Sequence, residues 1–267
     1  MSRTSLPPDL KLFRGSGDAG TYVWSPFVTK VEARLRFDGL RYTSGHGSPR
    51  SAPRGKIPYM EWHETTSAGD DAVSAMGDSA LIIRALVANG LLRDLNAALP
   101  TGALRAQDLA VRALLEDRVY FYGTREKWCD NYDEMVENML AAVPWPVRAV
   151  VGWMAQRATV RTLHGQGTGR LSDDEVLMFK EEVWEGVEAL LAEAKKKRTT
   201  GGDDAPFWVL GEEEPSEADA TLFGFIIGGL VSTAAPVTQA IVSKLPHVIE
   251  YAERIHDTYF PDYEKWK

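Results

Sequence analysis

Two short segments place polar side chains at the predicted starts of helices. Ser25 precedes Pro26, and serine followed by proline is typical of a helix N-cap and first helical residue. Asp78 and Ser79 precede an apolar run that begins at Leu81. The start of a helix offers unpaired backbone N–H groups and the positive end of the helix dipole, so each segment could hold an anion. The alternative for both segments is that they only cap their helices.

A third segment, Lys56-Ile57-Pro58-Tyr59, opens an apolar strand. We predict that the Ile57–Pro58 peptide bond is cis, which would expose the Ile57 backbone to a ligand. The alternative is an ordinary proline of an edge strand.

The chain carries a single cysteine, Cys129, and five scattered histidines. One cysteine excludes an intrachain disulfide framework and suits a reducing compartment. Cys129 lies beside Trp128 and outside any Cys-x-x-Cys motif, so we expect a buried or incidental thiol and disfavour a thiol–disulfide reductase. We predict no metal site, because the histidines form no ligand cluster.

Composition limits the possible functions further. The chain has 267 residues, 44% of them hydrophobic, which is enough for two domains that each bury a core. Its net charge is -8 and its basic residues are scattered, so we expect no nucleic-acid partner. The first twenty residues lack the apolar stretch of a secretory signal, and we expect a cytoplasmic protein.

The first third of the chain alternates strand and helix signals. Strands are predicted at 9–14, 40–43, 57–62 and 72–76. One helix should run from Pro26 to near Gly39, and a second from Asp78 to a close at Gly90. This order predicts a compact α/β domain at residues 1–92.

From about Leu91 the pattern becomes helical almost throughout, so we predict an all-helical domain at residues 93–267. Ser172 and Glu175 form a capping box for one of its helices. The helices are predicted at 103–127, 132–163 with a break at 145–146, 173–197, 217–231 and 246–259.

Residues 220–243 carry no charge and are long enough to span a bilayer. Glycines and Pro236 interrupt the segment, and its Ser, Thr and Gln side chains would need partners in lipid. We therefore expect a buried helix followed by a loop, and no transmembrane segment. Ser216 and Asp219, three residues apart before the apolar run, should cap this helix.

Three patterns together resemble the glutathione transferase superfamily. They are Ser25-Pro26-Phe27, then Lys56-Ile57-Pro58-Tyr59 followed by Gly77-Asp78-Ser79, and finally Ser216-Glu217-Ala218-Asp219 with the apolar residues that follow. The resemblance implies a thioredoxin-like N-terminal domain and an all-α C-terminal domain. It also implies glutathione as cosubstrate.

The C-terminal patterns resemble one branch, that of the failed-axon-connections and metaxin proteins. They are Leu245-Pro246-His247, Glu253-Arg254-Ile255 and Tyr259-Phe260-Pro261-Asp262-Tyr263. Two features depart from the superfamily: Asp78 replaces the commoner Glu or Gln, and residues 45–55 and 64–75 look like insertions near the ligand site.

The resemblance assigns roles to the residues above. Lys56, Ile57 and Pro58 would hold the cysteinyl backbone of glutathione, and Asp78 with Ser79 its γ-glutamyl end. A thiol of pKa near 8.5 is only about 3% ionised at pH 7, and the thiolate is the nucleophile. A hydroxyl hydrogen bond and a helix N-terminus together could lower that pKa by about one to two units. Ser25 is the expected donor, and Tyr22 is the alternative donor.

Two functions follow from the resemblance. The first is a transferase that joins the glutathione thiol to a hydrophobic electrophile, in detoxification and as a possible homodimer. The second is a noncatalytic binding or scaffold protein of the same fold. Fold alone does not choose between them.

Overall fold

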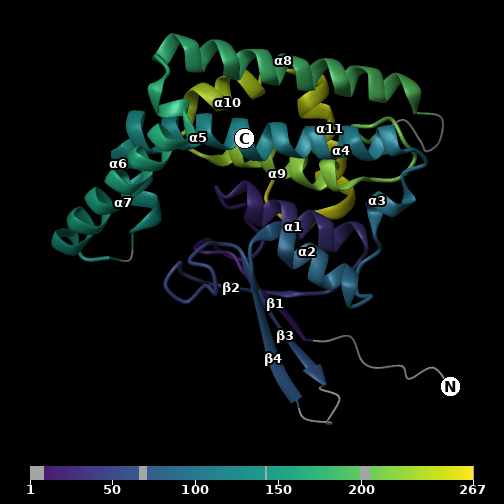
Figure 1. Cartoon of the computed structure of the whole chain (residues 1–267), viewed down its shortest axis with the longest axis horizontal. Coiled ribbons are helices and arrows are strands. Elements are labelled where there is room, and N and C mark those ends of the chain that lie inside the picture. The colour runs from purple at the N-terminus through teal and green to yellow at the C-terminus, as the bar shows by residue number, and fades with distance from the viewer. Residues whose placement is uncertain (1–8, 66–70, 142, 199–204, 267) are drawn as a thin grey trace.

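The computed structural model describes residues 9–65, 71–141, 143–198 and 205–266. A four-stranded sheet with two helices forms the N-terminal part, and helices form the rest (Figure 1). The strand order is β2-β1-β3-β4, with β1 parallel to β2 and β3 antiparallel to both of its neighbours. The strands are β1 Leu10–Phe13, β2 Thr43–Gly45, β3 Tyr59–Thr65 and β4 Asp71–Gly77.

Helices α1 (Pro26–Phe37) and α2 (Ser79–Ala88) pack against this sheet. Leu10 and Leu12 alternate inward from β1, and Val31 and Leu35 face them from one side of α1. The strand predicted at 40–43 begins only at Thr43. The preceding residues close α1, because the Leu40 N–H returns to the Leu35 carbonyl.

Strands β3 and β4 form a long hairpin whose register runs from Tyr59 opposite Gly77 to Thr65 opposite Asp71. The segment 64–75 therefore lies largely at the far end of the hairpin, away from Ile57 and Asp78. The expectation that it inserts near the ligand site is wrong for its described residues, because pairing carries the extra length outward along both strands. Residues 66–70 of that segment lie outside the described residues.

All later elements are helical, as predicted. The break expected at 145–146 lies earlier, since α6 ends at Met139 and Trp145 and Pro146 already begin the next helix, where proline is well tolerated. Short π-helical turns at Leu115–Val119 and Glu126–Asp130 interrupt the helix predicted at 103–127. The helices are α3 Leu95–Ala98, α4 Gly102–Leu114, α5 Tyr120–Arg125, α6 Tyr132–Met139, α7 Trp145–Gln166, α8 Asp173–Lys197, α9 Glu217–Val231, α10 Pro236–Val242 and α11 Pro246–Tyr259.

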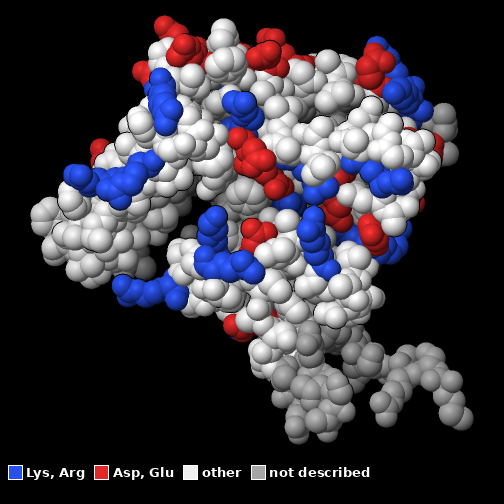
Figure 2. Space-filling view, in the orientation of Figure 1, with Lys and Arg blue, Asp and Glu red and all other residues white. Residues whose placement is uncertain are grey.

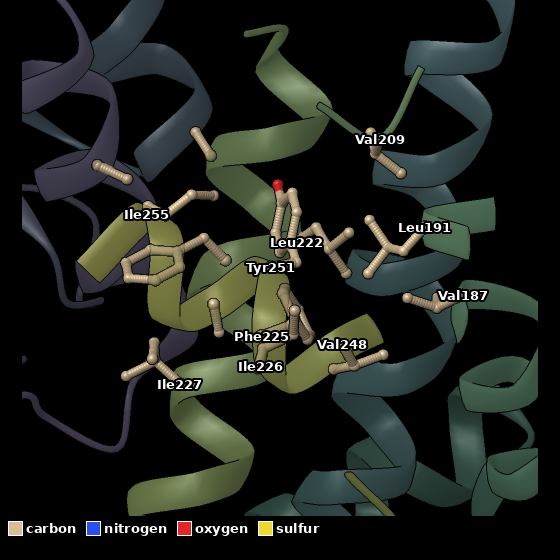
Figure 3. Packing of buried hydrophobic residues seen from close by; sticks show 14 of the residues in the cluster. Val187, Leu191, Val209, Leu222, Phe225, Ile226, Ile227, Val248, Tyr251 and Ile255 are labelled. Carbon is tan, nitrogen blue, oxygen red and sulfur yellow. The ribbon is translucent and has the colours of Figure 1, made fainter. Parts of the chain in front are cut away.

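Helix α9 is the centre of the helical domain (Figure 3). Its apolar side chains pack against those of α8, α11 and the segment around Val209. This confirms the buried helix expected after Ser216, but the loop expected to follow it is wrong in part, because Pro236–Val242 form helix α10. Among the described residues, no single helix could cross a membrane, and α9 with α10 would pass only as a pair bent by 120°.

The predicted cap of α9 is confirmed. The Ser216 backbone N–H and hydroxyl both donate to Asp219 Oδ2 at 2.8 Å, while Asp219 Oδ1 accepts from the Val209 N–H at 2.7 Å and the Tyr251 hydroxyl at 2.9 Å. Four donors thus satisfy a carboxylate that is fully buried. The second predicted capping box, that of Ser172 and Glu175 on α8, is also present.

Candidate functional site

The sheet topology brings three of the predicted segments to one edge. Phe13 at the end of β1 pairs with Tyr59 at the start of β3, and Tyr59 pairs with Gly77 at the end of β4. Ile57 therefore enters this edge directly before β3, and Asp78 leaves it directly after β4. Helix α1 connects two parallel strands, so it must start beside the same edge, and Ser25 precedes it.

The Ile57–Pro58 peptide bond is cis, which confirms the prediction. Pro58 is buried and Ile57 is partly buried, with its side chain packed over Gly15. The pairing of β3 begins at Tyr59, so the Ile57 backbone lies outside the ladder and is placed to bond a ligand. Lys56 is exposed beside it.

Asp78 has a φ of 83°, a left-handed conformation that is costly for a residue other than glycine. Its Oδ1 atom accepts hydrogen bonds from the N–H groups of Ala80 at 3.0 Å and Leu81 at 3.2 Å, so it caps α2. Both of these bonds use Oδ1, and Asp78 forms no salt bridge within the described residues. The other carboxylate oxygen is thus available to a cationic group. Ser79, the first residue of α2, is buried.

The loop of residues 46–56 packs over this edge. A Cβ atom added at Gly77 would lie 3.4 Å from the backbone nitrogen and the Cβ of Arg54, so the loop lies in close contact with the end of β4. Arg54 and Lys56 are both exposed and give the edge a positive charge. Figure 2 shows basic side chains bordering the recess between the sheet domain and the projecting helices. Such a field favours an anionic ligand.

Ser25 is partly buried, and its hydroxyl makes no capping hydrogen bond to α1. The carbonyl of Ser25 accepts the N–H of Val28 at 3.2 Å, which begins the helix without the side chain. The hydroxyl is therefore left to a ligand at the positive end of the α1 dipole. This geometry does not match the alternative in which Ser25 is only a cap.

Two glycines of α9 hold the start of α1 in place. A Cβ at Gly224 would lie 2.3 Å from the Pro26 carbonyl oxygen, and one at Gly228 would lie 3.4 Å from the Trp24 carbonyl oxygen. Close approach of the two backbones therefore requires Gly224. These glycines, which interrupt the apolar run in the sequence, position Ser25 from the helical domain.

Lys127 is a further residue of this site, and no sequence motif pointed to it. Its Nζ atom donates to the Trp24 carbonyl oxygen at 3.3 Å, one residue before Ser25. The buried amines of Lys30 and Lys180 lie 2.5 Å from carboxylate oxygens of Glu116 and Glu126, whereas Lys127 forms no salt bridge within the described chain. Burial lowers the pKa of Lys127 to about 8. No local pattern links residues 103 positions apart, so only the fold shows this pairing.

Tyr22 does not join this group. Its hydroxyl is hydrogen-bonded to His256 Nδ1 at 2.8 Å, and its ring packs among Phe223, Phe260 and Tyr263. Burial raises the pKa of the Tyr22 hydroxyl well above its ordinary value, which opposes ionisation. The structure therefore favours packing over thiol activation for Tyr22.

Cys129 is exposed, and partial burial of its sulfur raises the pKa of the thiol. It therefore lacks the lowered pKa of a reactive cysteine. Of the two expectations, a buried or an incidental thiol, the exposed position matches only the second. No group of three His, Cys, Asp or Glu side chains in the described ranges could hold a metal ion. A shallow groove of about 600 Å³ lies away from the sheet edge, between the end of α1 and the C-terminal tail, and none of the predicted site residues lines it.

Comparisons with known proteins agree with this geometry. Residues 26–135 match the family model of the glutathione S-transferase N-terminal domain. A glutathione S-transferase from Rhodospirillum rubrum F11 is 14% identical, covers 97% of this chain and 93% of its own, and superposes with a TM-score of 0.54. Rice GST1 in complex with glutathione is 15% identical over 98% of this chain and 92% of its own, with a TM-score of 0.52. Ure2p in complex with glutathione is 14% identical over 95% and 91%, with a TM-score of 0.50.

At these identities the solved structures establish the fold alone. The chain has the glutathione transferase fold, a thioredoxin-like domain followed by an all-helical domain, as the sequence predicted.

Proposed function

We propose that this protein binds glutathione at the sheet edge and transfers its thiol to a hydrophobic electrophile. The observation that carries the proposal is the convergence of a cis proline, an Asp-Ser helix start and the unbonded hydroxyl of Ser25 at that edge. Two solved structures of the same fold contain glutathione, which adds support.

Each part of the tripeptide has a chemical complement at this edge. The Ile57 backbone would pair with the cysteinyl backbone, with Pro58 as the turn that exposes it and Lys56 beside it. The free oxygen of Asp78 would accept the γ-glutamyl ammonium. The N-terminus of α2 at Ser79 would receive the neighbouring carboxylate.

The thiol would lie at the start of α1. Ser25 would donate its hydroxyl hydrogen to the sulfur, and the α1 dipole and the Lys127 ammonium would favour the thiolate over the thiol. The thiolate would then attack the electrophile, forming a carbon–sulfur bond and displacing the leaving group, while the thiol proton passes to solvent.

Calorimetric titration with glutathione tests binding. We expect Asp78→Asn to weaken binding roughly tenfold, because an amide retains the Oδ1 cap and loses the charge for the ammonium. Asp94→Asn is the matched control, since Asp94 caps α3 in the same way, away from the sheet edge. Equal affinities for the wild type and Asp78→Asn would remove Asp78 from the site, and no binding at all would refute the proposal.

A noncatalytic binding or scaffold protein is the second candidate function. The observation in its favour is the loop of residues 46–56, which packs over the end of β4 where the superfamily binds its ligand. The C-terminal patterns add a possible place in the failed-axon-connections and metaxin branch. Glutathione binding without product formation from an aryl halide would favour this candidate over the transferase.

A further inference from the structure

The hairpin of α6 and α7 projects from the body of the molecule (Figure 1). Its second helix begins with a run of exposed apolar side chains: Trp145 is 73% exposed, Trp153 53% and Met154 60%. Val147 and Val150 are also exposed. A soluble protein seldom leaves so many large apolar side chains together at one place, so this surface requires an occupant.

Some of the exposed residues form a row along α7, whereas Trp153 lies beside this row and Trp145, seven residues before the buried Gly152, lies on the other side of the helix end. Val147, Val150, Met154, Arg157 and Arg161 follow one another at spacings of three and four, which places them in a row along the helix. The opposite side of α7 carries the buried residues Gly152, which packs against Tyr132 and Val136 of α6, and Leu163. The row is therefore apolar near the tip of the hairpin and basic further along the helix.

The charge of α7 differs from that of the whole chain. The helix has 22 residues, among them Arg148, Arg157 and Arg161, and it contains no Asp or Glu. The chain as a whole has a net charge of -8. The acidic residues of the hairpin, Asp133, Glu134 and Glu137, all lie on α6. The exposed row of α7 is thus both apolar and positively charged.

We propose that the exposed row of α7 docks on an anionic lipid bilayer, with the apolar tip in the interface and the arginines at the headgroups. Tryptophan is favoured at the boundary between headgroups and acyl chains, and arginine is attracted to anionic headgroups. Arg157 lies one turn beyond Trp153, with its guanidinium 5.0 Å from the centre of the indole ring, so the two groups occupy adjacent depths.

A second copy of the chain is the competing occupant. A two-fold contact centred on Arg157 and Arg161 would set these residues of one protomer near the same residues of the other. Like charges at such a contact are unfavourable, whereas an anionic surface is attractive to both. The charges therefore favour the bilayer. The proposal is independent of any transferase activity.

The test is vesicle binding by the full chain. Sedimentation with vesicles of phosphatidylcholine alone, and with 30% phosphatidylserine, measures the partition coefficient. We expect clear binding to the anionic vesicles, at least roughly tenfold weaker binding to the neutral ones, and a blue shift of tryptophan emission on binding.

Two double variants separate the apolar and basic contributions. Trp145→Ala with Trp153→Ala should weaken binding at least roughly tenfold, and Arg157→Gln with Arg161→Gln roughly 30-fold on anionic vesicles only. Leu177→Ala with Met178→Ala and Lys197→Gln with Lys244→Gln are the matched controls, since these residues are exposed elsewhere. They should stay within about twofold of the wild type.

Three outcomes would overturn the proposal. In the first, the wild-type protein binds neither kind of vesicle. In the second, the control variants weaken vesicle binding as much as the α7 variants do. In the third, no vesicle is bound, and analytical ultracentrifugation shows a wild-type dimer that dissociates in Trp145→Ala with Trp153→Ala. The last outcome would assign the row to an interface between copies.

Discussion

Helix α1 contributes to two regions that differ in whether their polar side chains are paired within the protein. Along its length, charged side chains are buried and paired with the rest of the protein: Lys30 with Glu116, Glu32 with Arg14, and Arg34 with Glu217 and Asp38. At its start, the Ser25 hydroxyl forms no capping bond, and Lys127 beside it forms no salt bridge within the described residues.

The comparison separates structural polar groups from groups that we propose contact a ligand. A buried ion pair offers little net stability, but removing one partner leaves an uncompensated charge. The charges along α1 therefore lock the two domains in one arrangement. Substitution of the groups at its start should lower the free energy of unfolding less. We propose that these groups stabilise a bound anion. Substitutions in the two regions should differ in what they affect, stability in the first and ligand chemistry in the second.

The largest effect is expected for Arg34→Ala. Arg34 is fully buried, and its loss would leave Glu217 and Asp38 without their principal cation. We expect the free energy of unfolding to fall by about 3–5 kcal/mol in urea titrations. Arg93→Ala is the control, because Arg93 is 58% exposed although it also pairs with Asp38. A loss for Arg34→Ala as small as that of the control would remove the distinction between the two regions.

Ser25→Ala should act on chemistry rather than on stability. Loss of the hydroxyl hydrogen bond should raise the pKa of bound glutathione by about one to two units, with little change in glutathione affinity. Thiolate absorbance against pH measures this pKa in the wild type and the variant. If the two pKa values agree, Ser25 does not activate the thiol and the noncatalytic function gains support.

Lys127 should determine the alkaline limit of the reaction. Burial lowers its pKa to about 8, so in the free protein the ammonium is present below that pH and is lost above it. We expect kcat/KM to fall above about pH 8, because a neutral amine no longer stabilises the thiolate. Lys127→Met should lower kcat/KM at pH 7 roughly tenfold and abolish the alkaline decline.

Lys127→Arg is the matched control for charge. A guanidinium remains protonated at pH 9, so this variant should keep activity at pH 7 and lose the alkaline decline. An unchanged pH profile in both variants would show that Lys127 does not face the reacting sulfur.

The smallest effect is expected for Ser216→Ala in the helical core. The Ser216 hydroxyl is one of four donors to Asp219, and the other three remain in the variant. We expect a loss of about 1 kcal/mol in the free energy of unfolding, measured by thermal denaturation. The same variant should leave glutathione binding unchanged. Altered binding with unaltered stability would contradict a purely structural role for this cap.

The sequence predicted most elements because their signals are local. The start of α9 was predicted from Ser216 and Asp219, and the start of α8 from Ser172 and Glu175. The cis bond was predicted from the position of Pro58 after Ile57 at the start of a strand. The short helices α3 and α10 and the late start of β2 were not predicted. Elements of three to seven residues carry too little periodicity, and packing decides their limits.

The candidate site was predictable only in part. The residues at the starts of α1, α2 and β3 could be selected from motifs, and the topology confirms that they share one edge. Their assigned roles remain predictions. Three other features depend on contacts between residues far apart in the sequence, and no local pattern encodes them. They are the hydrogen bond of Lys127 to Trp24, the close approach of Pro26 to Gly224 and the burial of Tyr22.

The sequence by itself determined the two-domain order, the helix caps and the uncharged core helix, since these depend on neighbouring residues and on hydrophobic periodicity. Only the tertiary structure decided which polar groups are paired. Lys30, Glu32 and Arg34 would be expected at the surface of an isolated α1, yet all three are buried. They can be buried because Glu116 and Glu217 of the helical domain and Arg14 after β1 supply their counter-charges. The neutral hydroxyl of Ser25, in contrast, makes no capping hydrogen bond to α1.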